Sequence, residues 1–276
     1  MYKLKSFDNF NDFYQFNKSF INSNPLQNIF LTRVINSVLH GETTIYKFFN
    51  LIGANDELVL AIIVEQFCLV YTDNYDSDFL KLLSEELEFS KFNKYNFAGN
   101  KDTIENLLKF NNAKFSTDKH LSIYKCEKLN PDFQLSSGKI RLANIQDLKL
   151  LADFSVIFTK EYDGNVEPLE KMKYILNEAI TNKYLYVWED NHICSMALIM
   201  KKEQFDFPEI GHVFTPLQYR NNGYSSSLVY KMTEKLLENY NLTMLYTHGE
   251  NPASNRAFVK IGYKKTGDYV RCFKEE

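Results

Sequence analysis

The stretch that decides the fold is IGHVFTPLQYRNNGYSSSLV, residues 210–229. Its apolar start at residues 210–215 predicts a buried strand, Pro216 marks a turn, and Gly223 opens a segment with helical spacing. The apolar stripe of that helix consists of Leu228, Val229, Met232, Leu236 and Leu237. The stretch therefore predicts a strand, a turn and an amphipathic helix.

A helix that begins with glycine in this way is suited to binding an anion. The first turn leaves backbone N–H groups unpaired, and the helix dipole places partial positive charge there. Gly223 lets an oxygen approach closely, and Arg220 adds a permanent positive charge. A glycine at a helix start is also ordinary turn chemistry, so this motif alone leaves phosphate binding as a hypothesis.

The order Arg220-Asn221-Asn222-Gly223-Tyr224-Ser225 resembles the Arg-x-x-Gly-x-Gly/Ala signature of the GNAT superfamily of N-acetyltransferases. In that family the amides of the loop hold the pyrophosphate of acetyl-CoA. Ser225 departs from the usual glycine or alanine, but it is small and its hydroxyl can add a phosphate contact. The loop residues implied to bind the cofactor are Arg220, Asn221, Asn222, Gly223, Tyr224, Ser225 and Ser226.

The resemblance also implies contacts on either side of the loop. Five to seven positions before the arginine, Val213, Phe214 and Thr215 correspond to the strand whose main chain pairs with the pantetheine arm. Residues 245–263 resemble the second cofactor motif, in which Asn251 and Asn255 would face the same arm. An alternative for Asn251 is that it caps the helix beginning at Pro252.

The remainder of the second half matches the order of elements in this family. The match covers residues 139–273, and no fixed short repeat is evident. Its predicted strands are 139–143, 184–189, 193–201, 210–215, 242–247 and 263–273, and its predicted helices are 145–158, 166–180, 223–240 and 252–261.

The first half is predicted to be α+β, without an equivalent of the cofactor loop. Gly99-Asn100-Lys101 is the nearest candidate and lacks the preceding arginine and strand. Its helices are expected at 7–20, 25–38 with a stop at Gly41, 76–89 and 102–110, and its strands at 45–51, 58–64, 67–71 and 121–129.

Proline, serine and glycine in residues 131–138 predict a domain boundary. We therefore expect an α+β fold of tandem GNAT-like units, each a mixed, mostly antiparallel sheet flanked by helices. Residues 1–135 would be a degenerate, substrate-walling unit and residues 136–276 the acetyl-CoA-binding catalytic unit. The alternative for the first unit is a stabilising appendage.

Composition narrows the possible partners. The chain has 276 residues, 45% of them hydrophobic, and a net charge of −3, which argues against a nucleic-acid platform. The four cysteines, at positions 68, 126, 194 and 272, show no paired spacing typical of zinc or disulfides. The longest apolar run is too short to span a bilayer. We expect a cytoplasmic protein without a metal, membrane or nucleic-acid partner, as a monomer or homodimer with a small-molecule amine acceptor.

Acetyl transfer to an amine requires a neutral amine, a stabilised oxyanion and a proton for the leaving thiolate. A backbone N–H of residues 213–215 is the expected oxyanion donor. Many GNAT members carry a tyrosine as general acid where this chain has Phe258, so the acid stays open. The catalytic candidates are Glu209, His212, His248 and Tyr263, with Glu250 nearby in sequence.

Three functions are compatible with these patterns. The first is an acetyl-CoA-dependent N-acetyltransferase that acts on a small or amino-acid-like amine. The second is a non-catalytic acyl-CoA sensor, which Phe258 and the degenerate first half motivate. The third is an aminoacyl or peptidyl transferase of the tandem type, against which the near-neutral charge argues.

Overall fold

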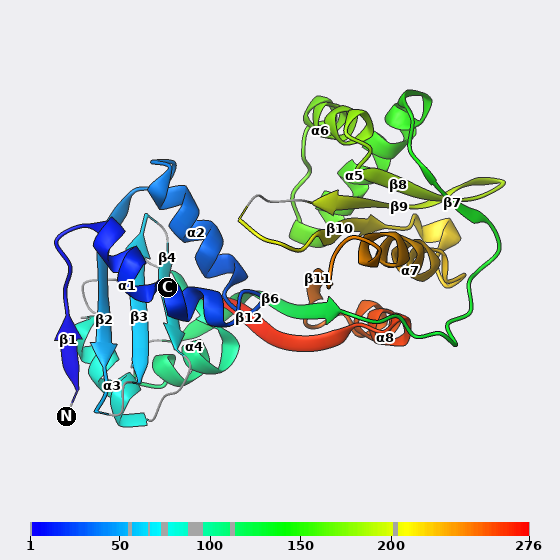
Figure 1. Cartoon of the computed structure of the whole chain (residues 1–276). Helices are drawn as coiled ribbons and strands as arrows, with labels where there is room; N and C mark the ends of the chain where they lie inside the picture. Colours follow the sequence, from blue (N-terminus) through cyan, green and yellow to red (C-terminus); the bar gives the residue numbers. More distant parts are fainter. Residues whose placement is uncertain are drawn as a thin grey trace. The chain divides into compact units, whose positions relative to one another are not determined.

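The computed structural model describes residues 2–54, 57–65, 67–72, 77–87, 96–110, 114–200 and 204–275. The chain forms two compact units. Unit 1 comprises residues 1–123, 247–250 and 266–276, and unit 2 comprises residues 124–246 and 251–265. Figure 1 labels the elements of each unit.

The first part of the chain follows the order strand, two helices, three strands, helix, strand, helix, strand. These elements are β1 (Lys3–Lys5), α1 (Phe10–Ser23), α2 (Ile29–Leu39), β2 (Ile45–Ile52), β3 (Leu58–Val64), β4 (Phe67–Thr72), α3 (Ser77–Glu86), β5 (Asn96–Asn100), α4 (Lys101–Leu108) and β6 (Phe115–Cys126).

The second part repeats this order, with two added 3-10 turns. Its elements are β7 (Lys139–Leu142), η1 (Ile145–Asp147), α5 (Leu148–Asp163), α6 (Leu169–Thr181), β8 (Leu185–Asp190), β9 (His192–Met200), β10 (Glu209–Phe214), η2 (Leu217–Tyr219), α7 (Tyr224–Leu237), β11 (Thr243–His248), α8 (Pro252–Ile261) and β12 (Lys264–Lys274).

Each unit is a sheet covered by helices on both faces. In unit 2 the strands run in the order β6-β11-β10-β9-β8-β7. Met196 and Leu198 of β9 pack with α5 and α6, whereas Ala197 and Ile199 pack with α7 and α8. Alternating side chains of a strand point to opposite faces, so β9 is apolar on both. The predicted α+β class with a mixed, mostly antiparallel sheet is confirmed.

Unit 1 is built in the same way, with the strand order β1-β2-β3-β4-β5-β12. Along β3, Ala61 and Ile63 contact α3 and α4, while Leu60 and Ile62 contact α1 and α2. Both units therefore place their first helix pair on one face of the sheet and their second pair on the other (Figure 1).

The elements differ from the predicted ones mainly where strands are short or polar. Sequence patterns missed β1, which has only three residues, and β5, whose sequence NFAGN carries glycine and asparagine. Strand β6 begins at Phe115, earlier than expected, and α5 continues to Asp163. Parts of the predicted turn at 53–56, helix at 76–89 and strand end at 201 lie outside the described residues.

The compact units divide the chain differently from the expected boundary at residues 135 and 136. The division falls inside β6, between Ile123 and Tyr124, and the C-terminal residues 266–276 belong to unit 1. The cause is β12, whose residues 269–272 pair antiparallel with residues 97–100 of β5. The final strand thus completes the sheet of the unit that begins the chain.

A buried pair of amides joins α1 to β2 in unit 1. Asn17 Nδ2 donates to Asn50 Oδ1 at 2.9 Å, and Asn50 Nδ2 donates to Asn17 Oδ1 at 2.8 Å. Further donations reach the carbonyls of Phe13 and Val59. Both side chains are fully buried. Because buried polar groups are costly unless paired, the two amides fix how α1 lies on the sheet.

We predict that Asn17→Ala lowers the free energy of unfolding by about 1–3 kcal/mol, because it leaves the buried amide of Asn50 without its partner. Chemical denaturation followed by circular dichroism measures the loss. Asn22→Ala is the matched control, since Asn22 is exposed on the same helix. Equal losses in the two variants would contradict the role of the pair.

Candidate functional site

The candidate site in unit 2 begins where two parallel strands separate. Strands β10 and β11 pair at one position, Glu209 with Met244, although both strands continue beyond it. In unit 1 the corresponding strands β4 and β5 pair at four successive positions, from Phe67 with Asn96 to Val70 with Gly99. Unit 2 therefore has an opened strand pair where unit 1 has a closed one.

A bulge in β10 accompanies this opening. Gly211 pairs with Leu198 of β9, but the next recorded pair is Phe214 with Met196, so one extra residue lies on β10. His212 lies in this bulge with a φ of 52°. This left-handed conformation is uncommon for residues other than glycine, and bulges of this kind redirect the backbone near functional sites.

The loop that follows is exposed and ends at the start of α7. Asn221 and Gly223 both adopt left-handed backbone conformations, with φ of 66° and 76°. Gly223 is the N-cap of α7, and no side-chain hydrogen bond caps the helix there. When residues of positive and negative φ alternate before a helix, their backbone N–H groups form a concave surface that suits an anion. The anion site predicted from the motif requires this backbone geometry, and anion binding itself stays a prediction.

Arg220 is oriented by two contacts within unit 2. Its Nε donates to the carbonyl of Thr215 at 2.9 Å, and its Nη2 donates to Glu161 Oε2 at 2.6 Å. Glu161 lies in the last turn of α5 and is about half exposed. The guanidinium is thus held beside the loop with one carboxylate already in contact.

Ser136 supports the loop through its backbone and its side chain. Its hydroxyl donates to the carbonyl of Asn222 at 2.6 Å, and its N–H donates to Ser227 Oγ at 2.8 Å. A Cβ added at Gly223 would come within 2.6 Å of the Ser136 hydroxyl. A larger residue at position 223 would be strained by the left-handed backbone and would displace the Ser136 hydroxyl from this contact. Sequence patterns gave no signal for Ser136, because its partners lie 86 and 91 positions away.

The side chain of Tyr224 is hydrogen-bonded to Asp190, at the turn between β8 and β9. Its hydroxyl donates to Asp190 Oδ2 at 2.9 Å, and Ser137 Oγ donates to the same oxygen at 2.6 Å. These two hydrogen bonds lower the pKa of Asp190. At residue 224 the backbone N–H, rather than the phenol, is the group that suits an anion.

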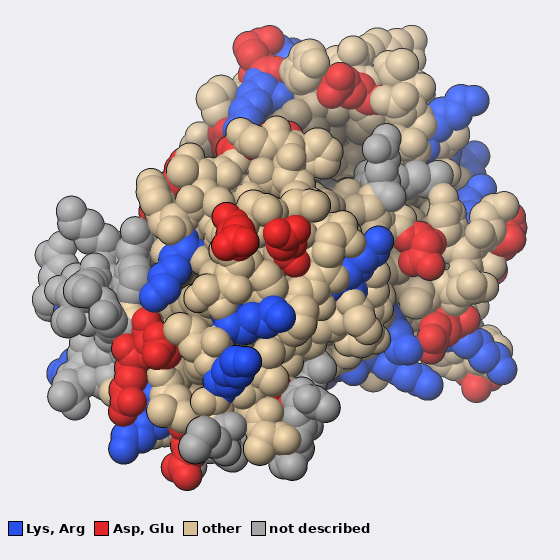
Figure 2. Space-filling view, turned by 60° about the vertical axis from the view of Figure 1, so that its left-hand side comes forward, with Lys and Arg blue, Asp and Glu red and all other residues tan. Residues whose placement is uncertain are grey.

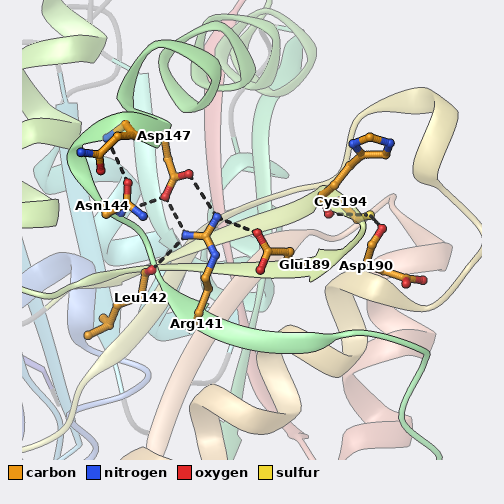
Figure 3. A network of polar contacts seen from close by, with 9 residues as sticks. Arg141, Leu142, Asn144, Asp147, Glu189, Asp190 and Cys194 are labelled. Carbon is orange, nitrogen blue, oxygen red and sulfur yellow. Dashed lines mark hydrogen bonds and ion pairs between the residues drawn. The ribbon is translucent and has the colours of Figure 1, made fainter.

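Helix α5 is anchored at its start by the network that Figure 3 shows. Arg141 of β7 donates to both carboxylate oxygens of Asp147, at 2.6 and 3.1 Å, and to Glu189 of β8 at 2.9 Å. Asp147 also accepts the N–H of Asn144 in a capping box. Burial opposes ionisation of Asp147, but these donors together lower its pKa.

The catalytic candidates occupy different environments. Glu209 is buried at the first residue of β10, where the strands begin to separate. His212 Nε2 lies 2.9 Å from Ser155 Oγ, and burial lowers its pKa to about 4. Its imidazole is therefore neutral near pH 7. His248 and Glu250 belong to unit 1.

Tyr263 does not fit the role expected of it. Its side chain is 1% exposed, and its hydroxyl lies 2.7 and 2.9 Å from the hydroxyls of Thr233 and Thr243. Burial raises its pKa above the ordinary value. Phe258 packs edge-on against Tyr263 in the same core. A phenol held in this way is enclosed in the core of unit 2, and this geometry gives no support to a role as proton donor to substrate.

The two asparagines of the second motif lie on α8. Asn251 is its N-cap and accepts the N–H of Ser254 at 3.1 Å, so the capping alternative describes the structure. Asn255 follows one turn later, with its Oδ1 buried. A pantetheine contact by either residue stays a prediction.

The residues that the structure describes include neither a metal-binding cluster nor a membrane-spanning helix. Within those ranges no group of three or more His, Cys, Asp or Glu side chains is arranged to hold a metal ion. All four cysteines are buried thiols. Among the helices that the structure describes, none combines the length and apolar character that crossing a bilayer requires.

Known proteins share the fold of this chain. Residues 193–272 match the family model described as FR47-like protein. An acetyltransferase of the GNAT family from Colwellia psychrerythraea superposes with a TM-score of 0.61 and 15% identity, over 99% of this chain and 100% of that chain. A GCN5-related N-acetyltransferase from Sphaerobacter thermophilus gives 0.56 and 12%, over 87% and 85%. No curated protein matches the chain.

The chain therefore has the GNAT acetyltransferase fold, and the predicted resemblance of its C-terminal half to that superfamily is confirmed. More specifically, residues 193–272, which match the FR47-like model, contain the separated strands β10 and β11 and the loop before α7 at residues 215–223, called the α7 loop below.

We predict that Asp147→Asn lowers the free energy of unfolding at pH 7 by about 1–3 kcal/mol, because two charge-assisted hydrogen bonds are lost. The pKa of Asp147 is lowered in the folded state, so its contribution is present above the ordinary value of 3.8 and disappears as the pH falls below it. The difference between wild type and variant should therefore shrink below pH 4. Glu170→Gln, an exposed ion-pair change on α6, is the control.

Proposed function

We propose that the chain is an acetyl-CoA-dependent N-acetyltransferase whose acceptor is the primary amine of a small or amino-acid-like molecule. The observation that carries the proposal is the combination of an opened strand pair with an exposed, uncapped helix start directly after it. Unit 1 closes the equivalent strands, which supports one acyl-CoA site per chain, in unit 2.

The α7 loop is the proposed seat of the diphosphate. Backbone N–H groups at residues 223–226 supply neutral donors, and Arg220 supplies positive charge. The hydroxyls of Ser225 and Ser226 are half-buried at the same helix start. Asn221 and Asn222 shape the loop and contribute main-chain groups. Acetyl-CoA bound there would extend its pantetheine arm along the open edge of β10.

The bulged part of β10 is the proposed site of oxyanion stabilisation. Phe214 O accepts from Ser195 Oγ at 2.9 Å, and Thr215 O accepts from Arg220 Nε. The main-chain acceptors of these two residues are thus already used within the protein. Val213 lies with His212 in the bulge, between the positions at which β10 pairs with β9, and we assign its main chain to the thioester. Its N–H would stabilise the charge that develops on the carbonyl oxygen.

Transfer itself requires few side chains. The neutral amine attacks the thioester carbon, the tetrahedral intermediate expels the thiolate of CoA, and the ammonium proton passes to a base. We assign that base to Glu209, acting through water, because its carboxylate lies where β10 and β11 separate. The thiolate takes its proton from water, since Phe258 has no proton and Tyr263 is enclosed.

A non-catalytic acyl-CoA sensor is the second candidate. The observation that favours it is the apolar, buried side chain of Phe258 together with the enclosed hydroxyl of Tyr263. Isothermal titration with acetyl-CoA tests the binding that both candidates share. Release of CoA thiol in the presence of a panel of primary amines separates them, because a sensor would bind without amine-dependent turnover.

The aminoacyl-transferase alternative gains no support from surface charge. On the face drawn in Figure 2, basic and acidic side chains are interspersed among uncharged ones. An RNA partner is favoured by a continuous basic surface. Thiol release stimulated by aminoacyl-tRNA rather than by free amines would nevertheless overturn the choice of acceptor.

We predict that Gly223→Val weakens acetyl-CoA binding at least tenfold, about 1.4 kcal/mol, because the branched side chain meets Ser136 and obstructs the phosphate oxygens. Titration calorimetry measures the change. Gly41→Val is the matched control: Gly41 has the same left-handed backbone, with φ of 74°, and open space around a Cβ, but lies in unit 1. Unchanged affinity in a folded Gly223→Val protein would remove the loop from the site.

Substitutions of Arg220 and Glu161 should act in opposite directions. Arg220→Ala should weaken CoA more than a phosphate-free pantetheine thioester, whereas Glu161→Gln should strengthen CoA roughly twofold to fivefold by removing a competing negative charge. Affinities for CoA and for the thioester give the comparison. Glu234→Gln, which breaks the exposed Lys231–Glu234 pair on α7, controls for loss of charge alone. Equal losses for both ligands in Arg220→Ala would exclude a phosphate contact.

A further inference from the structure

The bulge of β10 is a strained piece of backbone that must be held in place. His212 adopts a left-handed conformation, which is unfavourable for residues other than glycine. Strain of this kind persists where the surroundings determine the conformation. Contacts with neighbouring elements must therefore fix His212.

Helix α5 supplies those contacts. Ser155, which is fully buried on α5, has its Oγ 2.9 Å from His212 Nε2. The imidazole also lies against the ring of Phe158, one turn further along α5, with centroids 4.2 Å apart. Because burial lowers the pKa of His212 to about 4, the ring is neutral at physiological pH and keeps this hydrogen bond.

The helix that presents Ser155 is itself held firmly. Its start is tied to β7 and β8 through Arg141, Asp147 and Glu189, as Figure 3 shows. On the other side of the bulge, Ser195 of β9 donates to the carbonyl of Phe214 at 2.9 Å. The bulge is thus fixed from the helix layer at His212 and from the neighbouring strand at Phe214.

We propose that Ser155 and His212 form a positioning pair, through which α5 holds the β10 bulge so that the backbone N–H of Val213 faces the thioester carbonyl. This inference rests on the proposed function and deepens it. His212 acts through the backbone rather than as the base. The Val213 N–H stabilises the charge that develops on the carbonyl oxygen, and the Ser155 hydroxyl keeps this N–H in place. No bond to either side chain forms or breaks during transfer.

The pair should affect the transition state more than ground-state binding. The diphosphate is held by the α7 loop, which Ser155 and His212 do not contact among the interactions described. Loosening the bulge would therefore leave most of the CoA affinity intact. It would weaken the hydrogen bond to the carbonyl oxygen, whose complete removal in other enzymes costs about 10²–10³ in rate.

The test uses the full chain with acetyl-CoA carrying a ¹³C-labelled thioester carbonyl. In Ser155→Ala, the dissociation constant by calorimetry should stay within twofold of wild type. The infrared stretch of the bound carbonyl should move toward its frequency in free acetyl-CoA, because hydrogen bonding lowers that frequency. The rate of thiol release should fall by about threefold to thirtyfold with an unchanged KM for acetyl-CoA.

His212→Asn provides a second variant, because asparagine tolerates the left-handed conformation but loses the contacts with Phe158. It should show the same shift of the carbonyl stretch. Thr233→Val is the matched control, since it removes a buried hydroxyl of unit 2 that bonds Tyr263 instead. It should lose stability without moving the carbonyl stretch.

Two results would overturn the inference. A wild-type carbonyl frequency and thiol-release rate in folded Ser155→Ala and His212→Asn would show that the pair does not position the bulge. Absence of acetyl-CoA binding to the wild-type chain would refute the proposed function and the positioning role with it. Calorimetry on the wild type separates the second result from the first.

Discussion

The separation of β10 from β11 beyond the Glu209–Met244 pair is the constraint on which the candidate site depends. Parallel strands normally satisfy each other's backbone groups along their whole shared length. Here the extra residue of the bulge at His212 ends the regular ladder on β10. In the proposed function, acetyl-CoA lies along this strand edge and supplies the missing hydrogen bonds.

The two units differ in the pairing of one parallel strand pair, which is closed in unit 1 and opened at the candidate site of unit 2. Both follow the same order of elements, and both place a parallel strand pair before the last helix. In unit 1, Gly99 pairs with Val70, and a Cβ at residue 99 would come within 2.2 Å of the Val70 carbonyl. This glycine permits the close backbone approach of β4 and β5, whereas in unit 2 the separation of β10 from β11 is accompanied by a bulge in β10.

The contacts around the candidate site come largely from α5 and from the segment before β7. Ser155, Glu161 and Ser136 reach His212, Arg220 and Asn222 from 57, 59 and 86 positions away. Polar side chains such as these follow no periodic pattern, and each is unremarkable in sequence. The hydrogen-bond partners of the buried Tyr263 hydroxyl likewise come from other elements, Thr233 of α7 and Thr243 of β11.

The amino-acid sequence by itself determined the strand, loop and helix at residues 210–237, the boundaries of β3 and α8, and the resemblance to the GNAT superfamily. Apolar periodicity, Gly223 and Pro252 are local signals, so they predict these elements without information about distant contacts. Only the tertiary structure decided that β12 completes the first unit's sheet and that His212 is held by Ser155. Strand partners and side-chain partners depend on contacts between distant residues, which a sequence pattern does not contain.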